Sequence, residues 1–227
     1  GDVYKRQDVS YVSNISQFGD PDVVIIPGSK NTISDLLWMR QNGLEGKILR
    51  HAAKGGIVFG ICGGYQMLGQ SISDPTGAEQ KGTVRGMGLL PVTTVFEQEK
   101  RRTRVSGRFA KVGGALAEMS GVCYEGYEIH MGRTVLSKGT VPLVYMEEEG
   151  EQRQDGAQSD HVYGCYMHGI FDMSETVKTF LAAVLRKKGI DPSKITVRDR
   201  NAYKEEQYDR LASIVRENPN MEAVYKI

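Results

Sequence analysis

The feature that most constrains the fold is a cysteine that lies between glycines directly after an apolar run. Residues 57–61 (Ile-Val-Phe-Gly-Ile) are apolar and rich in β-branched side chains, as in a buried strand of a parallel sheet. Cys62 follows, and helical spacing of apolar residues begins at Tyr65. A sharp turn from strand to helix needs small residues two positions before and two after its apex, where Gly60 and Gly64 stand. The sequence therefore predicts that Cys62 is raised above the edge of a sheet.

The preceding segments have the order expected of an α/β protein. Residues 22–27 form a short apolar, β-branched run that ends at Pro27 and Gly28, which predicts a buried strand opening into a loop. Two segments with helical spacing, 33–40 and 44–53, connect this run to the strand before Cys62. The alternation of strand and helix predicts a parallel sheet with right-handed crossovers.

The remaining segments predict a β extension followed by two helices. Shorter strands are expected at residues 89–96, 103–109, 125–130 and 142–146, and an exposed loop or hairpin at 147–160. A last strand is expected at 163–167. An amphipathic helix is expected from Ser174, as N-cap, to Lys188, and another at 202–216 with Tyr208, Leu211 and Val215 facing inward. Residues 1–8 are interpreted as an unstructured leader or linker remnant, and residues 9–227 as one domain.

Composition and charge exclude several classes of protein. The chain has 227 residues, about 40% of them hydrophobic, which suffices for one core. Its formal net charge of +1 provides no field that would attract nucleic acid or an anionic membrane surface. Three cysteines without a CxxC spacing fit neither a disulfide framework nor a metal site and favour a reducing compartment. No apolar run approaches the roughly 18 residues of a membrane span, so a cytoplasmic protein is expected.

Cys62 is the candidate nucleophile. At the N-terminus of the helix after the turn, free N–H groups and the helix dipole are expected to lower the thiol pKa and favour the thiolate. The backbone N–H of Gly63 would face a developing oxyanion. A structural cysteine in a glycine-rich turn, or a phosphate-binding loop, is the alternative interpretation of the same pattern.

His168 is the candidate base, because it directly follows the strand expected at 163–167. If that strand is parallel to the one before Cys62, both residues lie at the same edge of the sheet. His51 and His161 are interpreted as solvated surface residues, whereas His130 stays open as a site residue. Gly28 follows the first strand, and its backbone N–H is a candidate second oxyanion donor.

Five motifs together resemble class I glutamine amidotransferases, and most closely the C-terminal glutaminase domain of the cobyric acid synthase type. The resemblance extends from about Val9 to the C-terminal helix, which is nearly the whole chain, and the fourth motif is the most discriminating. The motifs are Pro-Gly-Ser-Lys-Asn-Thr (27–32), Gly-Ile-Cys-Gly-Gly-Tyr-Gln-Met-Leu-Gly (60–69), Gly-Met-Gly-Leu-Leu (86–90), Gly-Tyr-Glu-Ile-His-Met-Gly-Arg-Thr (126–134) and Tyr-Met-His-Gly-Ile-Phe-Asp (166–172). The resemblance implies a three-layer, flavodoxin-like α/β fold with a mostly parallel central sheet and a smaller β extension.

The resemblance also implies roles for individual residues. Cys62 would attack the side-chain amide of glutamine, and His168 would protonate the leaving ammonia before water hydrolyses the thioester. Gly28 and Gly63 would form the oxyanion hole. Ser29 and Gln66 would bind the substrate, although a glutamine on a helix surface is the alternative for Gln66.

The site departs from the usual triad at one position. Many class I members have Glu two residues after the histidine, where this chain has Ile170. The resemblance therefore implies a Cys-His dyad and leaves open what orients His168. Asp172 is a candidate, or else it caps the helix near Ser174. Glu128 and His130, on one face of a strand, are assigned to the site wall or to acceptor contacts.

The chain lacks the phosphate-binding motif Gly-x-x-x-x-Gly-Lys-Ser/Thr that ATP-dependent amidation requires. No cofactor is expected in this chain, and ATP with Mg²⁺ is expected on a synthetase domain that precedes it or forms a separate subunit. The implied function is to hydrolyse L-glutamine and supply ammonia for amidation of corrin side-chain carboxylates, from adenosylcobyrinic acid a,c-diamide to adenosylcobyric acid, in cobalamin biosynthesis. The corrinoid acceptor would be bound mainly by the partner. Alternatives are a subunit that amidates a cell-wall lipid precursor, and a cysteine hydrolase or a catalytically silent binding domain on the same turn.

Overall fold

The central sheet is four-stranded and mostly parallel. The computed structural model describes residues 8–148, 150–197 and 200–217. In spatial order the strands are β1 (Val23–Ile26), β2 (Ile57–Ile61), β10 (Val162–Cys165) and β9 (Ala157–Ser159). The first three are parallel to one another, and β9 is antiparallel to β10. The predicted parallel sheet is confirmed.

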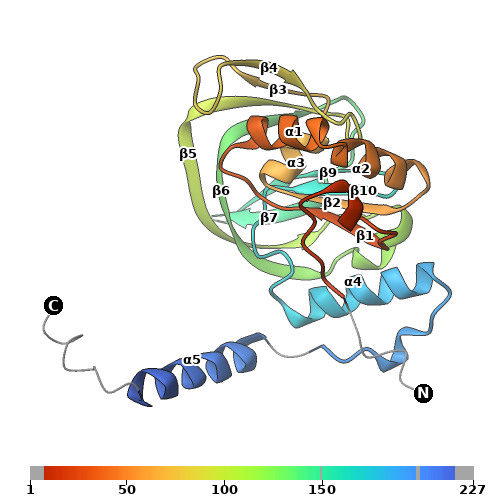
Figure 1. The fold of residues 1–227 in the computed structure, drawn as a ribbon, viewed down its shortest axis with the longest axis vertical. Helices are drawn as coiled ribbons and strands as arrows, with labels where there is room; N and C mark the ends of the chain where they lie inside the picture. Colours follow the sequence, from red (N-terminus) through yellow and green to blue (C-terminus); the bar gives the residue numbers. More distant parts are fainter. Residues whose placement is uncertain (1–7, 149, 198–199, 218–227) are drawn as a thin grey trace, which may run out of the picture.

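Helices cover both faces of this sheet, which gives the predicted three layers (Figure 1). On one face lie α1 (Thr32–Gln41), α2 (Leu44–Ala53) and α3 (Gly63–Leu68). On the other lies α4 (Ser174–Lys187), beside the 3₁₀ segment η2 (Gly114–Met119). The alternation along β2 produces both halves of the core, because Ile57 and Phe59 pack with α4 while Val58 packs with α1 and α2.

The β extension is larger than the sequence predicted. It contains six strands: β4 (Gly82–Arg85), β3 (Ser71–Asp74), β5 (Val92–Phe109), β7 (Val144–Glu148) and β8 (Glu151–Asp155), with β6 (Cys123–Leu136) paired to β5. The strands expected at 89–96 and 103–109 are one 18-residue strand, β5. The polar run between them had indicated a break in the strand. The strand continues because β6 forms backbone hydrogen bonds with β5 both before and after a register shift that follows Phe96. The loop or hairpin expected at 147–160 contains β8 and β9.

The C-terminal helix α5 (Arg200–Glu217) forms where expected, but its inward face was predicted wrongly. Tyr208, Leu211 and Val215 are 57%, 58% and 40% exposed, because the helix extends away from the sheets (Figure 1). Ser174 is the first residue of α4 rather than its N-cap, which is Met173.

The remaining segments are short. Two further 3₁₀ segments are η1 (Ile15–Gln17) and η3 (Pro192–Lys194). Residues 1–7 of the predicted leader lie outside the described residues, and the boundary at residue 9 stays a prediction. In the described part of the chain no helix is both long enough and apolar enough to cross a membrane.

The turn around Cys62 depends on one very close backbone approach. A Cβ added to Gly64 would lie 2.0 Å from the Ile26 carbonyl oxygen, and backbone atoms cannot move aside locally. We expect Gly64→Ala to lower the free energy of unfolding by at least about 2 kcal/mol. The matched control is Gly46→Ala in α2, where a Cβ meets nothing within 4 Å; alanine there should stabilise the helix by roughly 0.5–1 kcal/mol. Urea unfolding measures both, and equal stability of Gly64→Ala and the wild type would contradict this packing.

Candidate active site

Three parallel strands bring the predicted site residues to one edge of the central sheet. Ile26 at the end of β1 pairs with Gly60, and Cys165 at the end of β10 pairs with Ile61. Cys62 is tied to β10 because its N–H donates to the Cys165 carbonyl, 2.9 Å away. The loops that follow β1, β2 and β10 therefore start side by side. They carry Gly28, Cys62 and His168.

Cys62 occupies a strained backbone conformation at the apex of the turn. Its φ of 53° and ψ of −110° lie in a region that residues other than glycine rarely adopt. Such strain costs about 1–3 kcal/mol and persists where the surrounding packing enforces it. The two flanking glycines permit that packing: a Cβ on Gly60 would lie 2.7 Å from the Gly64 carbonyl oxygen. The predicted strand-to-helix turn is confirmed.

Gly28 lies between Cys62 and His168, the candidate nucleophile and base. A Cβ built on Gly28 would be 2.8 Å from Cε1 of His168 and 3.5 Å from Cβ of Cys62. A larger residue would therefore displace the imidazole ring. The three residues that the sequence selected from distant segments meet at one point.

His168 is held by strand β6 through its backbone and its ring. Beyond β10, its backbone forms a two-way hydrogen-bonded pair with Tyr127, at 3.1 and 2.9 Å. The Tyr127 ring also stacks on the imidazole, with centroids 5.2 Å apart and planes within 7°. Ile170 is fully buried in the core, and Asp172 donates its N–H to the Gly169 carbonyl in the turn that follows His168.

The Ile129 carbonyl faces both members of the dyad. The Cys62 thiol donates to this oxygen over 3.4 Å, and the same backbone group favours the protonated imidazole of His168 and so raises its pKa. The group is a backbone atom of β6, so no motif of side chains could have identified it.

The surroundings of the dyad favour its neutral form. Burial raises the pKa of Cys62 to about 11, despite a hydrogen bond from the Gly63 N–H that lowers it. Burial also lowers the pKa of His168, and the nearby His130 adds to this effect. The expectation of a lowered thiol pKa is wrong for this state, because Cys62 is only 6% exposed and α3 has only six residues. Desolvation therefore outweighs the helix terminus.

The other predicted substrate contacts lie on both sides of Cys62. Ser29 approaches Gly63, since a Cβ on Gly63 would be 2.9 Å from the Ser29 nitrogen. The Ser29 hydroxyl itself bonds to Asp35 and accepts from the Asn31 N–H at 2.8 Å. Gln66 is 2% exposed, so the alternative of a surface glutamine is wrong. Its amide donates to the Tyr166 hydroxyl at 3.1 Å, and that hydroxyl also bonds Thr134.

Glu128 anchors β6 beside the dyad through a buried ion-pair cluster. Its carboxylate is 0% exposed and contacts Arg101 at 3.0 Å, Arg153, and His130 at 3.5 Å. Burial alone would raise the pKa of Glu128, but the adjacent His130 ring and the Arg153 charge hold it below the ordinary value. His130 stacks on Tyr166 with centroids 3.7 Å apart. His130 lines the pocket described below, whereas the assignment of Glu128 to the site wall stays a prediction.

Comparison with known proteins identifies the family of this site. A model of the CobB/CobQ-like glutamine amidotransferase domain matches residues 3–176, more than half of the chain. The chain belongs to this family. Among curated relatives, the cobyric acid synthase of Ruminiclostridium cellulolyticum is 51% identical over 96% of this chain and 43% of its own length. That of Lachnoclostridium phytofermentans is 42% identical over 99% of this chain and 46% of its own length. The chain thus spans less than half the length of these relatives.

Two solved structures confirm the fold of this amidotransferase domain. A glutamine amidotransferase structure superposes with a TM-score of 0.50 at 16% identity, covering 74% of this chain and 80% of its own. The structure of PurLQS from Thermotoga maritima has a TM-score of 0.57 at 18% identity, covering 79% and 85%. The class I glutamine amidotransferase fold predicted from the motifs is therefore confirmed.

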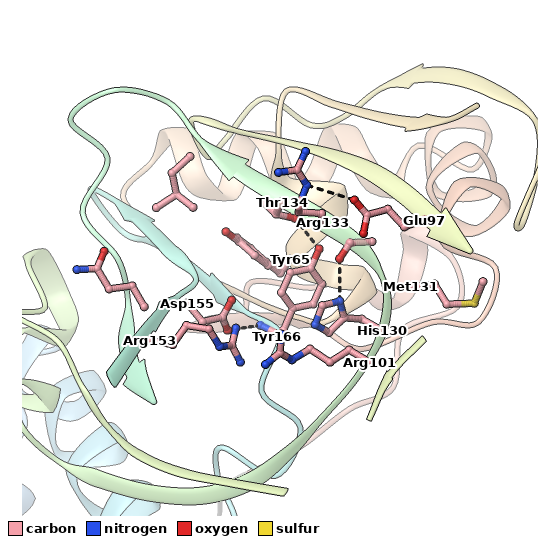
Figure 2. Close-up of a pocket in the computed structure, with 13 residues that line it drawn as sticks. Tyr65, Glu97, Arg101, His130, Met131, Arg133, Thr134, Arg153, Asp155 and Tyr166 are labelled. Carbon is pink, nitrogen blue, oxygen red and sulfur yellow. Dashed lines mark hydrogen bonds and ion pairs between the residues drawn. The ribbon is translucent and has the colours of Figure 1, made fainter. Parts of the chain in front are cut away.

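This amidotransferase domain contains a pocket of about 370 Å³ (Figure 2). Its lining includes Tyr65, His130, Thr134, Arg153, Asp155 and Tyr166, from α3, β6, β8 and the segment after β10. Cys62 and His168 do not line it; Tyr65, on the helix after Cys62, and His130, next to Ile129, do. Sequence reasoning missed Tyr166, Arg153 and Asp155, because each reaches the site only through sheet pairing. Burial raises the pKa of Asp155 to about 6.

The other histidines lie at the opposite end of β2. His51 contacts the Ile57 carbonyl through Nε2 at 3.1 Å and meets the edge of the Phe18 ring. His161 lies next to Gly55, and its carbonyl accepts from the Val58 N–H. Both are half-buried rather than solvated, since they close the amino end of the sheet. Neither is placed to act on Cys62.

The raised thiol pKa predicts a steep pH dependence of alkylation. Below a pKa of about 11 the thiolate fraction of Cys62 rises about tenfold per pH unit, so labelling by iodoacetamide should keep accelerating from pH 7 to pH 10. Peptide-resolved mass spectrometry separates Cys62 from the exposed Cys123, and Cys62→Ala supplies the blank. A labelling rate that reaches its plateau below pH 8 would contradict the neutral dyad.

Proposed function

We propose that this chain is the glutaminase domain of a cobyric acid synthase. It hydrolyses glutamine and supplies ammonia for ATP-dependent amidation of corrin side-chain carboxylates, from adenosylcobyrinic acid a,c-diamide to adenosylcobyric acid. The observation that carries the proposal is the strained Cys62 facing His168 across Gly28 in a CobB/CobQ-like amidotransferase domain. The names of the curated relatives favour this acceptor over a cell-wall lipid precursor.

The proposed chemistry starts from the neutral pair. The thiol turns from the Ile129 carbonyl to the imidazole, and its proton moves to His168 as Sγ attacks the amide carbon of glutamine. The oxyanion accepts hydrogen bonds from the backbone N–H groups of Gly28 and Gly63. The imidazolium then protonates the leaving nitrogen, and ammonia departs from a glutamyl thioester. Water attacks the thioester, gives a proton to His168 and releases glutamate, which regenerates the thiol.

The Ile129 carbonyl takes the place of the missing carboxylate. A carbonyl oxygen that accepts from one imidazole N–H leaves the other ring nitrogen to receive the thiol proton. It carries no full charge, so it stabilises the imidazolium less than a glutamate would. The Tyr127 ring, which stacks on the imidazole, fixes the plane of the His168 ring, which a single hydrogen bond would not fix.

Gln66 and Ser29 are the proposed substrate contacts. The Gln66 side chain is fixed by Tyr166, so it requires no reordering when glutamine binds. The Ser29 hydroxyl is engaged with Asp35 of α1 and with Asn31, which leaves the Ser29 backbone, close to Gly63, as the group that faces the substrate.

The synthetase activity is assigned to a partner. The curated relatives are more than twice as long as this chain, and the chain has no phosphate-binding loop. ATP, Mg²⁺ and most contacts to the corrinoid belong to the synthetase domain or subunit. L-glutamine is the substrate of this chain, its location is the cytoplasm, and neither nucleic acid nor a membrane is a partner.

The nucleophile and base are tested by glutamine-dependent ammonia release. We expect Cys62→Ala and His168→Ala each to reduce release at least about 1,000-fold, because thioester formation needs both groups. Cys123→Ala is the matched control, since Cys123 is exposed at the start of β6, and it should keep wild-type activity. If the isolated wild type is silent, covalent labelling of Cys62 by a glutamine-mimicking electrophile replaces turnover as the readout. Equal ammonia release by the wild type and Cys62→Ala would refute the assignment.

Gly28→Ala tests the spacing of the dyad separately. The methyl group would force the His168 ring away while the backbone N–H of the oxyanion hole remains. A displacement of about 1 Å lowers the rate on the order of 100-fold, so kcat should fall by this amount with unchanged unfolding temperature. Gly113→Ala, where the Cβ has only a 3.8 Å contact, is the control. Unaltered kcat in Gly28→Ala would show that the ring is not held against Gly28.

A further inference from the structure

The helix α5 carries an apolar stripe that no part of the described chain buries. Tyr208, Leu211, Ile214 and Val215 are 57%, 58%, 53% and 40% exposed. Their spacing of three, three and one residues places them on one side of the helix. Asp209, Ser213 and Arg216 occupy the opposite side. This is the pattern of a helix that binds to another surface.

An 18-residue helix with this composition depends on that surface. It is about 27 Å long, and its 18 residues only slightly exceed the roughly 12–15 residues below which isolated helices are marginal in water. Most helical stability in proteins comes from the packing of an apolar face, and α5 projects away from both sheets (Figure 1). The stripe therefore requires a partner that is not among the described residues.

The relatives indicate what that partner is. The match to the family model ends at residue 176, well before α5. The cobyric acid synthase of L. phytofermentans nevertheless aligns with 99% of this chain, which includes α5. The helix is thus shared with full-length cobyric acid synthases, and more than half of that relative's length lies outside the match.

We propose that the Tyr208, Leu211, Ile214 and Val215 face of α5 docks in an apolar groove of the synthetase region of a cobyric acid synthase. This interface rests on the function proposed above, which requires such a region. It corresponds to helix-in-groove recognition, in which residues at i, i+3 and i+7 are the anchors. Its consequence is that the ammonia-producing domain stays attached to the domain that consumes ammonia.

The test uses a full-length enzyme: the R. cellulolyticum cobyric acid synthase with its matched region replaced by this chain. Leu211→Asp places a charge in the stripe, and Ser213→Asp places the same charge on the opposite side as the matched control. We expect Leu211→Asp to lower glutamine-dependent amidation of cobyrinic acid diamide roughly 10-fold or more relative to ammonia-dependent amidation, because a charge in a buried anchor position weakens the interface. Ser213→Asp should leave this ratio unchanged.

Amide hydrogen exchange provides a readout that does not need activity. Amides of α5 should exchange at least about tenfold more slowly in the full-length enzyme than in the isolated chain, and Leu211→Asp should abolish this difference. In the isolated chain, Leu211→Asp should leave the unfolding temperature and the labelling of Cys62 unchanged, which excludes a folding defect.

Three outcomes would overturn the interface. One is α5 protection in the isolated monomer together with a lower unfolding temperature of Leu211→Asp, which means that the chain buries the stripe itself. Another is a dimer of the isolated chain that Leu211→Asp dissociates, which makes a second copy the occupant. The third is equal amidation ratios and equal exchange in Leu211→Asp and Ser213→Asp. A full-length enzyme that protects α5 but amidates with neither nitrogen source contradicts only the proposed acceptor.

Discussion

The close contact between the turn at Cys62 and the end of β1 is the constraint on which the site depends. Gly64 lies so near the Ile26 carbonyl that no side chain fits between them. This contact fixes the height of α3 above the sheet and keeps Cys62 in its strained conformation. It also brings the loop after β1 against Cys62, which places Gly28 between Cys62 and His168. A change at this contact therefore alters the turn, the proposed oxyanion hole and the position of His168 together.

Strand β6 supplies what the central sheet lacks. In the central sheet His168 follows β10, and Ile170 stands at the position where many class I members have a glutamate. Three nearby residues of β6 make separate contacts at this edge. Tyr127 stacks on the His168 imidazole, the Ile129 carbonyl accepts a hydrogen bond from the Cys62 thiol, and His130 packs on Tyr166. Glu128 ties the same stretch to two arginines. Because a carboxylate without charged partners is costly to bury, the cluster resists displacement of the strand. The position of the Ile129 carbonyl thus depends on the ion-pair cluster of Glu128, the residue before it.

The sequence allowed prediction of those parts that local chemistry determines. Gly60, Cys62 and Gly64 predicted the turn, and the apolar runs at 22–27 and 57–61 predicted parallel strands whose ends meet. The length of β5 could not be predicted, because its middle is polar and only the backbone pairing with β6 keeps it extended. The role of the Ile129 carbonyl could not be predicted for a related reason, since every residue has a backbone carbonyl and the sequence does not distinguish one from another. The outward stripe of α5 was misjudged because helical spacing indicates a buried face without indicating which molecule buries it.

Burial of Cys62 has two opposing effects on the proposed reaction. It raises the cost of forming a thiolate before substrate arrives, as the thiol pKa of about 11 indicates. The same low-dielectric surroundings strengthen the interaction of the Gly28 and Gly63 N–H groups with an oxyanion that forms later. A site of this kind favours proton transfer to His168 during the attack on glutamine rather than before it. The lowered pKa of His168 fits this order, because an imidazole that is neutral at rest is ready to accept the proton. Burial therefore disfavours a free thiolate at rest. The species that the site is expected to stabilise is the charged transition state.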